Sequence, residues 1–339
     1  MSSAKLRTIQ VGLGGWGRDW AKRVVPQIEA VQLVAYVEPD PSSLELVTGD
    51  APRFTSFDDA VAAVEADAVL VTAAVAAHVP VVRQALEAGK HVLVEKPFAP
   101  TVEEGQALVE LAKQRNLTLM VSQNYRFFPA PRAVRELVVA GELGALHHID
   151  LEFRQHSVRR PGRPSPHHAY AQPLLDDMSI HHFDLLRFIT GESPESVFCQ
   201  TWNPSWSGFS GPPAASAVMT FGGNISVSYR GSWVSHQPAT PWAGEWRMAF
   251  EKGDITWTSR GANDSAEADE VSVITGDETK RLDLTQLTWT DRWGTLSEFA
   301  DAVLAGREPQ CTGLDNLGSL ALRSGAIDSA DRRAVVNFD

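Results

Sequence analysis

The sequence predicts an α/β protein in which a doubly wound parallel sheet is followed by an α+β domain with a large, mostly antiparallel, open sheet. In the first third of the chain, short apolar strands alternate with helical patterns, and a glycine-rich turn separates the first strand from the first helix. Longer segments with alternating polar and apolar residues follow. A chain of 339 residues is long enough for two domains, which we expect at residues 1–124 and 125–339.

Five apolar runs of strand length form the predicted parallel sheet. They have few polar interruptions, which is typical of strands that helices cover on both faces. Helical patterns lie between them: one ends at Gly89, and another begins with Thr101 and Glu104, the spacing of a capping box. The five runs are residues 8–12, 32–38, 68–74, 91–96 and 117–124, and the two helices are residues 79–88 and 101–115.

The pattern changes after Asn124. Two β-hairpins are predicted, because short Gly-containing turns separate alternating segments. A helix is expected to end at Gly141, and the proline-rich segment 159–172 is expected to be a loop. The hairpins cover residues 214–233 and 245–258, and the helices residues 131–140, 174–190, 296–305 and 316–330.

Tryptophans interrupt the polar–apolar alternation of the second domain. We therefore expect the open sheet to have an apolar outer face, which another copy of the chain must cover. This predicts a homodimer or homotetramer that forms through the sheet.

Composition excludes several classes of partner. The net charge of −12 argues against nucleic acid or an anionic membrane as the main partner. Cys199 and Cys311 are not in a C-x-x-C or Cys/His cluster, so no metal site is predicted, and two free thiols are typical of a reducing cytosol. The N-terminus does not resemble a signal peptide, and the longest apolar run, residues 68–77, is too short to span a bilayer. We expect a cytoplasmic protein.

The glycine-rich turn predicts a dinucleotide site. Gly12, Gly14 and Gly17 fit the pattern G-x-G-x-x-G, with Gly15 and Trp16 between them, after a strand and before a helix that runs toward residue 25. The first glycine permits the turn, the second lets the backbone approach a pyrophosphate, and the third lets the helix pack closely. The alternative is a purely structural strand–helix turn.

Glu38 ends the second strand, about twenty residues beyond the glycines, where an acidic side chain accepts hydrogen bonds from ribose hydroxyls. A carboxylate there repels a 2′-phosphate, and residues 39–43 contain no Arg or Lys to neutralise one. We therefore expect NAD to be preferred over NADP. A solvated glutamate at the end of a strand is the alternative.

Residues 89–97 read Gly-Lys-His-Val-Leu-Val-Glu-Lys-Pro, which resembles the G-K-H-V-x-x-E-K-P motif of the Gfo/Idh/MocA oxidoreductase family. The glycine motif, residues 124–126 (Asn-Tyr-Arg) and residues 177–181 (Asp-Met-Ser-Ile-His) extend the resemblance along the chain. It implies a Rossmann domain and a C-terminal sheet domain that often mediates oligomers. It also implies that Glu95 and Lys96 contact the cofactor.

The resemblance implies three catalytic residues: His181 as general base, Asp177 as its partner or a substrate ligand, and Lys96 as a third substrate ligand. Their chemistry agrees, because an ammonium stabilises an alkoxide and imidazole titrates near neutral pH. Asp177 and His181 are four residues apart in a predicted helix, so they share one face of it. Asp184 lies three residues beyond His181, on nearly the same face. The alternatives are a surface lysine beside Glu95 and a helix with buried polar groups.

His182 is a competitor of His181 for the role of base, although it points about 100° away around the helix. Tyr125 and Arg126 are candidate substrate contacts. Arg159, Arg160 and Arg163 are candidates for an acidic substrate, although a solvated loop explains them equally well.

The chain departs from the family pattern at two places. Ala73-Ala74 stands where relatives have Thr-Pro ahead of a histidine, which is His78 in this chain. Residues 170–175 stand where many relatives are glycine-rich. The expected reaction is NAD(P)-dependent oxidation of a secondary hydroxyl in a sugar, a sugar derivative or an inositol-like cyclitol. The alternatives are an NAD-dependent glycosidase acting through transient oxidation and a non-catalytic dinucleotide-binding protein.

Overall fold

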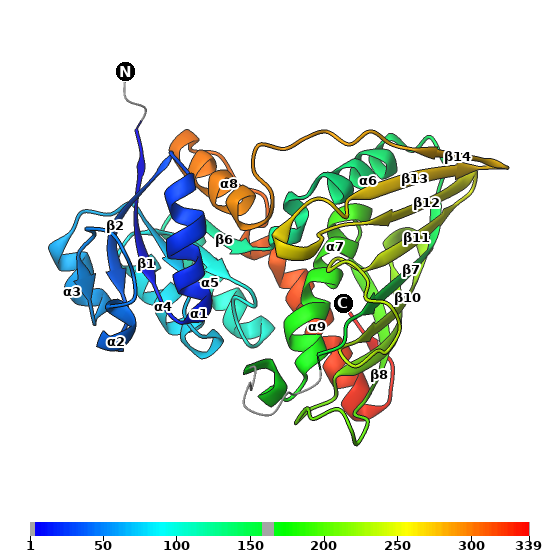
Figure 1. Ribbon diagram of the computed structural model, residues 1–339, viewed down its shortest axis with the longest axis horizontal. Helices are drawn as coiled ribbons and strands as arrows, with labels where there is room; N and C mark the ends of the chain where they lie inside the picture. Colours follow the sequence, from blue (N-terminus) through cyan, green and yellow to red (C-terminus); the bar gives the residue numbers. More distant parts are fainter. Residues whose placement is uncertain (1–3, 158–165, 339) are drawn as a thin grey trace. The chain divides into compact units, whose positions relative to one another are not determined.

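The computed structural model describes residues 4–157 and 166–338, and the chain divides into two compact units (Figure 1). The first unit contains Met1–Asn124 and Asp291–Leu317, and the second contains Tyr125–Thr290 and Gly318–Asp339. The sequence predicts that everything after residue 124 lies in the second domain. The return of Asp291–Leu317 to the first unit was therefore not anticipated, because it depends on long-range packing that local patterns do not encode.

The first unit contains a parallel sheet of six strands in the order β3-β2-β1-β4-β5-β6. The doubly wound fold is confirmed, and each of the five predicted runs overlaps one strand. A two-residue strand, β3, was not predicted because it is too short to have a period. The strands are β1 (Leu6–Val11), β2 (Val31–Val37), β3 (Arg53–Phe54), β4 (Ala68–Val71), β5 (His91–Glu95) and β6 (Leu119–Ser122).

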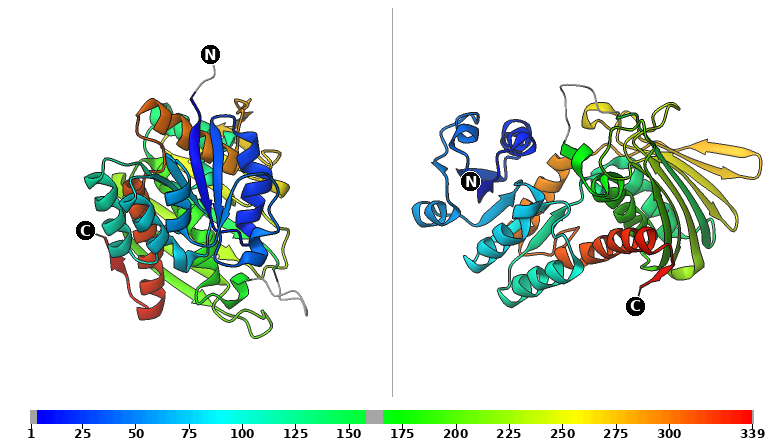
Figure 2. Two further views of the ribbon diagram at one scale, coloured as in Figure 1. Left: turned by 90° about the vertical axis from the view of Figure 1, so that its left-hand side faces the viewer. Right: turned by 90° about the horizontal axis from the view of Figure 1, so that it is seen from below.

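Helices lie on both faces of this sheet, as Figure 2 shows. α1 (Gly15–Asp19) continues as a π-helical turn (Trp20–Val24) and a 3-10 turn (Val25–Gln27), and α8 (Asp291–Ala305) packs against this continuation. The predicted cap of α5 is present: the Thr101 side chain accepts a hydrogen bond from the Glu104 N–H. The remaining helices are α2 (Pro41–Leu44), α3 (Phe57–Ala63), α4 (Val75–Glu87) and α5 (Val102–Gln114).

The second unit contains a nine-stranded sheet in the order β14-β13-β12-β11-β7-β10-β9-β8-β15. β7 and β10 pair in parallel and the other pairs are antiparallel, as the prediction of a mostly antiparallel sheet requires. Both predicted hairpins form, β9–β10 and β11–β12. The strands are β7 (Leu146–Arg154), β8 (Pro194–Trp202), β9 (Ala214–Phe221), β10 (Ile225–Ser232), β11 (Glu245–Phe250), β12 (Gly253–Thr258), β13 (Glu270–Thr275), β14 (Glu278–Arg281) and β15 (Val336–Asn337).

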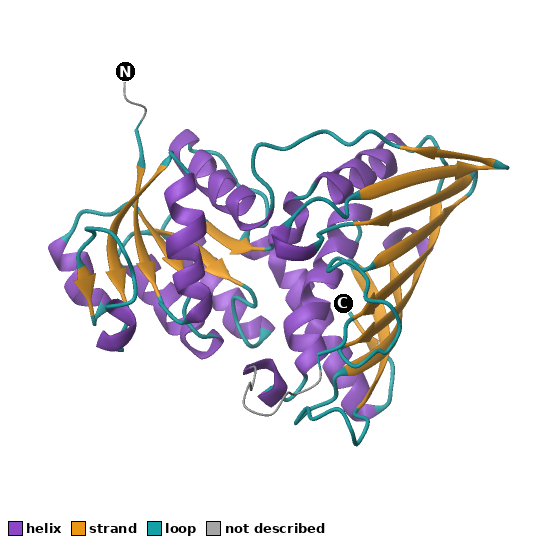
Figure 3. Ribbon diagram, viewed as in Figure 1, coloured by secondary structure: helices purple, strands orange, loops and turns teal. Residues whose placement is uncertain are grey.

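One face of this sheet is covered by helices, which Figure 3 shows in purple beside the orange strands. α6 (Pro129–Ala140) ends at Gly141, whose φ of 67° is the left-handed conformation expected there. α7 (Ile180–Thr190) and part of α9 (Gly313–Arg332) complete the layer. Buried aromatic side chains from sheet and helices form the core, including Phe153, Phe183, Tyr229, Trp246 and Trp257.

The outer face of the sheet is mainly polar, with Val218 of β9 as an exposed apolar exception, so the expectation of an apolar outer face is wrong. Along β10, buried Val227 and Tyr229 alternate with Ser226, Ser228 and the exposed Arg230. The tryptophans that interrupt the pattern lie mainly on the helix-covered face, where Trp246 and Trp257 stack with centroids 4.5 Å apart. Ion pairs cross the outer face, joining Arg154 to Glu152 and Glu245 and Arg230 to Glu152.

Candidate functional site

The glycine turn lies at the carboxyl end of β1, where doubly wound folds bind ligands. Gly12 has a φ of 95°, and a Cβ there would lie 2.3 Å from the Ala73 backbone. A Cβ on Gly17 would lie 2.0 Å from the Gly12 carbonyl oxygen, so this glycine lets the helix pack against the strand. Gly14 and Gly15 instead face open space, since a Cβ on either would meet nothing within 4 Å. The turn is thus tightly packed at Gly12 and Gly17, whereas Gly14 and Gly15 leave room for a pyrophosphate to approach the backbone N–H groups.

Glu38 is held beside this turn. Its Oε2 accepts a hydrogen bond of 2.7 Å from the Leu13 N–H, and its Oε1 accepts one of 3.2 Å from the Asp40 N–H. Arg18 Nη1 donates to the Leu13 carbonyl oxygen at 2.8 Å. Arg18 and Glu38 thus both contact Leu13, an arrangement that no pattern in residues 39–43 indicates.

Glu95 and Trp16, both predicted cofactor residues, are in direct contact. Glu95 is buried at the end of β5, where its Oε1 accepts hydrogen bonds from Trp16 Nε1 at 2.9 Å and Trp20 Nε1 at 2.8 Å. Its Oε2 accepts from the Lys96 backbone N–H at 3.3 Å. The Glu95 carboxylate therefore holds both the Trp16 indole and the backbone of Lys96.

His78, which follows the departure at Ala73-Ala74, is held by two backbone carbonyls. Its imidazole is buried, with Nδ1 2.8 Å from the Pro97 carbonyl oxygen and Nε2 3.1 Å from that of Ala73. Both contacts are to backbone atoms, so they do not depend on the side chain at residue 73. Burial lowers the pKa of His78 below its usual range, although the two carbonyls and Glu95 oppose that shift.

In the second unit, Asp177 and His181 lie on one continuous helical run that is not a uniform α-helix. Leu175–Ser179 forms a π-helical turn that contains Asp177, and His181 is in the first turn of α7. Such π turns are often found at functional sites. Asp177 is partly exposed and His181 is buried, with 5% of its surface exposed.

The His181 ring is held by aromatic stacking. It lies parallel to the ring of Tyr125, with centroids 4.1 Å apart and an interplanar angle of 4°. Arg260 contacts the same phenol: Nη1 donates to Tyr125 Oη at 3.0 Å, and Cζ lies 4.7 Å from the ring centroid. Arg260 has a φ of 59°, a left-handed conformation that is costly for an arginine. No sequence motif indicated Arg260, which follows β12.

His182 has a different environment from His181. Its Nδ1 lies 3.2 Å from Tyr229 Oη and its Nε2 lies 3.1 Å from the Trp242 carbonyl oxygen. Burial lowers the pKa of His182 to about 4, with a smaller opposing effect from the Trp242 carbonyl. A neutral imidazole that donates to Trp242 and accepts from Tyr229 has both nitrogens occupied within the protein core. This arrangement argues against His182 as a base for substrate.

Arg126 is held in a buried ion pair. Its Nε and Nη2 donate to the two carboxylate oxygens of Asp184, each at 2.6 Å, and Ser319 Oγ donates to Asp184 at 2.8 Å. Bidentate pairs of this kind fix both side chains. The pair favours a structural role for Arg126 over the predicted role in substrate contact. Asp184 has the same structural role, as the acceptor of both hydrogen bonds from Arg126.

The predicted site residues thus form two groups. Gly12, Gly14, Gly15, Trp16, Gly17, Glu38, Glu95 and Lys96 belong to the first unit, and Tyr125, Arg126, Asp177 and His181 belong to the second. The candidate arginines Arg159, Arg160 and Arg163 lie outside the described residues. Cys199 and Cys311 are both buried, and burial raises the pKa of the Cys199 thiol to about 12.

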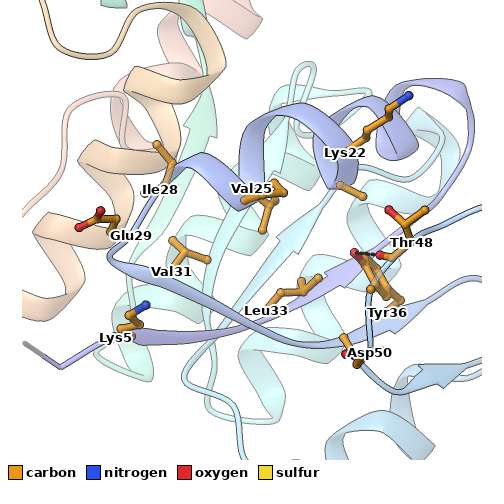
Figure 4. Close-up of a pocket in the computed structure, with 14 residues that line it drawn as sticks. Lys5, Lys22, Val25, Ile28, Glu29, Val31, Leu33, Tyr36, Thr48 and Asp50 are labelled. Carbon is orange, nitrogen blue, oxygen red and sulfur yellow. Dashed lines mark hydrogen bonds between the residues drawn. The ribbon is translucent and has the colours of Figure 1, made fainter. Parts of the chain in front are cut away.

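A cavity of about 480 Å³ in the first unit lies away from the glycine turn (Figure 4). It is bordered by residues that begin β1 and β2, including Lys5, Val31 and Leu33, and by Lys22 and Asp50. The lining runs along β2 from Val31 to Tyr36 and includes no residue of the glycine turn, where doubly wound folds bind a dinucleotide. We do not assign the cofactor to it. Across residues 4–157 and 166–338, no helix is long and apolar enough to cross a membrane.

Comparison with known families matches both units. The model of the oxidoreductase family with an NAD-binding Rossmann fold matches residues 6–123, and the GFO/IDH/MocA C-terminal domain model matches residues 132–256. The two matches therefore cover both the parallel sheet and most of the antiparallel sheet.

Among curated proteins, inositol 2-dehydrogenases are similar to this chain. The enzyme of Corynebacterium glutamicum is 34% identical over 200 residues, 58% of this chain and 57% of that enzyme. The enzyme of Rhizobium meliloti is 26% identical over 336 residues, 96% of this chain and 97% of that enzyme.

Solved structures share the fold. An Agrobacterium radiobacter oxidoreductase in complex with NAD⁺, L-tartaric acid and magnesium has a TM-score of 0.86 at 20% identity, covering 98% of both chains. The aldose–aldose oxidoreductase of Caulobacter crescentus has a TM-score of 0.83 at 21% identity, covering 98% of this chain and 100% of that one. At these identities the likeness establishes the fold alone. With both family models matched in order along the chain, this protein belongs to the Gfo/Idh/MocA family and is an NAD(P)-dependent oxidoreductase.

Proposed function

We propose that the protein oxidises a secondary hydroxyl of a sugar, a sugar derivative or a cyclitol, with NAD as the hydride acceptor and His181 as the general base. The inositol 2-dehydrogenases among its relatives support this substrate class. The main observation in its favour is the contrast between two adjacent histidines. His182 has both nitrogens engaged in the core, whereas His181 is oriented by the Tyr125 ring.

The first unit fits a bound dinucleotide. Gly14 and Gly15 leave the backbone open to a pyrophosphate, and Glu38 stands where a ribose would present its hydroxyls. The nicotinamide supplies the acceptor for the hydride. Trp16, Glu95 and Lys96 line the carboxyl end of β5, where we expect them to contact the nicotinamide half.

The protein residues supply the proton chemistry. The unprotonated ring nitrogen of His181 takes the proton of the substrate hydroxyl, as a positioned imidazole does near neutral pH. Lys96 donates a hydrogen bond to the same oxygen and stabilises its developing negative charge. Asp177 either orients His181 or binds a neighbouring hydroxyl of the substrate.

The test is a substrate panel with the purified protein, NAD⁺ or NADP⁺, and absorbance at 340 nm. The panel contains cyclitols such as myo-inositol, free aldoses, nucleotide sugars and 4-nitrophenyl glycosides, with His181→Ala as the control. We expect net NADH formation with a cyclitol or sugar and none with the variant. Release of nitrophenol without net NADH would identify a glycosidase. Nucleotide binding without turnover of any compound would identify a non-catalytic binding protein.

The same proposal includes self-association through the outer face of the nine-stranded sheet. Because that face carries hydroxyl groups and a ladder of ion pairs, its contacts would be polar, and added salt should weaken them. Light scattering at micromolar protein should give a dimer or tetramer at low salt. A monomer at every salt concentration rules this out.

A further inference from the structure

The indole of Trp16 extends over the part of the sheet edge that we assign to nicotinamide. The strand order β2-β1-β4-β5 places Glu38, at the end of β2, on one side of the glycine turn and Glu95, at the end of β5, on the other. A dinucleotide that crosses the glycine turn has its adenosine on the Glu38 side and its nicotinamide on the Glu95 side. Trp16 begins at the turn and reaches Glu95 through its Nε1.

Arg292, the second residue of α8, stacks on this indole. Its Cζ lies 4.1 Å from the centroid of the Trp16 ring, and its side chain is only 1% exposed. The rings of Trp20 and Trp293 lie 5.8 and 5.4 Å from the same Cζ. Trp16 itself remains 46% exposed, so part of the indole that the guanidinium supports is available to a ligand.

The charges near the indole have fixed positions. Arg292 Nη1 pairs with Asp19 Oδ2 at 2.7 Å, and Asp19 Oδ1 lies 3.5 Å from Arg23. The Glu95 carboxylate lies at the indole edge. Among these groups, Arg292 is the one whose charge stacks on the ring, and its burial among aromatic side chains limits screening by solvent.

We propose that Arg292 is a specificity-determining residue for the redox state of the nucleotide. Its guanidinium is a fixed positive charge behind Trp16 that disfavours the cationic oxidised nicotinamide relative to the neutral reduced one. The inference rests on the proposed function, because it requires the nicotinamide to lie against Trp16. Stacking on the indole stabilises both redox forms, but only the oxidised form carries a charge on the ring for Arg292 to repel.

The test measures dissociation constants for NAD⁺ by calorimetry and for NADH by fluorescence, without any substrate. Arg292→Met removes the charge and keeps an apolar side chain of similar length. We expect the ratio Kd(NAD⁺)/Kd(NADH) to fall about three- to tenfold. A loss of packing around Trp16 would weaken both forms together, so the ratio separates the electrostatic effect from a structural one.

Two further variants test the direction in which the ratio Kd(NAD⁺)/Kd(NADH) changes. Asp19→Asn removes the counter-charge of Arg292, and it should raise the same ratio about two- to threefold. Arg292→Lys keeps the charge but loses the planar stack, so both dissociation constants should increase while their ratio stays within about twofold. Thermal melting checks that each variant is folded. If Arg292→Met does not fold, the opposite shift expected in Asp19→Asn still decides the question.

The possible failures are distinguishable. A wild-type protein that binds neither nucleotide overturns both the inference and the proposed function. Binding with normal turnover, but with the ratio unchanged in Arg292→Met and Asp19→Asn, overturns the inference alone. A ratio that moves in the same direction in both variants also overturns it, because opposite charges were removed.

Discussion

The two units hold their candidate functional residues by different means. At the glycine turn of the first unit, the positions depend largely on backbone: two glycines permit close packing, two face open space, and Glu38 is held by the Leu13 N–H. In the second unit, the positions depend on side chains that are distant in sequence. Tyr125 stacks on His181 across 56 residues, and Arg126 pairs with Asp184 across 58. A site built on backbone is visible in a local motif, whereas a site built on side-chain contacts becomes visible only in the fold.

This contrast is tested most strongly at His181. His181→Ala should lower turnover by roughly 10²–10⁴-fold, the usual contribution of a positioned acid–base group. NADH binding should persist, since the nucleotide is assigned to the first unit. The measurements are kcat at 340 nm and NADH fluorescence titration.

The neighbouring histidine is the control for this prediction. His182→Gln should keep turnover within a fewfold of wild type, because the amide can donate to Trp242 and accept from Tyr229. An inactive His182→Gln beside an unchanged His181→Ala means that the wrong histidine has been assigned. Asp177→Asn should cost less than His181→Ala if Asp177 only orients the base.

The second prediction asks whether the two units serve one transition state. Lys96→Ala should lower turnover about 10²-fold, the scale seen when one donor to a developing oxyanion is removed. In Lys96→Ala/His181→Ala, the two losses should not add if both groups act on one hydroxyl oxygen, as we propose. Full additivity of the logarithms of kcat would assign Lys96 to a separate role, such as cofactor binding.

Much of the fold followed from sequence because it depends on local periodicity. Buried strands of the parallel sheet read as continuous apolar runs, and the cap at Thr101 is a four-residue pattern. The polar outer face was mispredicted because an interrupted polar–apolar alternation does not tell which face of the sheet the interrupting tryptophans lie on. They lie instead on the face that the helices cover, as Trp246 and Trp257 show.

The site was predictable only in part, for the same physical reason. Gly12 to Gly17, Glu95 and Lys96 lie within motifs whose spacing carries their chemistry. Arg292 and Arg260 reach Trp16 and Tyr125 through long-range folding, and no local pattern marks either arginine. Arg126 lies within a motif, but its partner Asp184 could not be inferred from spacing, so its ion pair was missed.

The third prediction concerns Arg260, which holds Tyr125 and through it His181. Arg260→Met should lower kcat about 10- to 100-fold with little change in NADH affinity, since small displacements of a catalytic group are costly. The effect should vanish in the His181→Ala background, whereas a general loss of stability would persist there. An equal loss of kcat in the wild-type and His181→Ala backgrounds would falsify the positioning role.

The fourth prediction tests the role of Glu38, which lies beside the glycine turn, in the choice between NAD and NADP. Glu38→Ser with Pro39→Arg should shift preference toward NADP by about tenfold or more, since a cation replaces a charge that repels the 2′-phosphate. Wild-type protein should prefer NAD, and equal or tighter NADP binding by calorimetry would remove Glu38 as the cause. Arg18 is the internal control. If Arg18→Met reduces NADP affinity in the Glu38→Ser protein, Arg18 rather than position 39 supplies the cation.

The last prediction concerns the free energy of unfolding rather than turnover or binding, and it tests whether His182 is held neutral in the core. The pKa of His182 is lowered from 6.5 to about 4 by burial, so between these values the unfolded chain binds a proton that the folded protein does not. Stability must therefore fall as pH decreases from 6.5 toward 4, by on the order of 3 kcal/mol for a shift of this size. His78 and His91, whose pKa values are also lowered by burial, add to the loss with the same sign. Urea unfolding at pH 7.5 and pH 5 measures it, and His182→Gln should lose less stability on acidification than wild type because the amide does not titrate. An identical pH dependence in the two proteins would mean that His182 is not held neutral in the core, and the structural argument that separates it from His181 would fail with it.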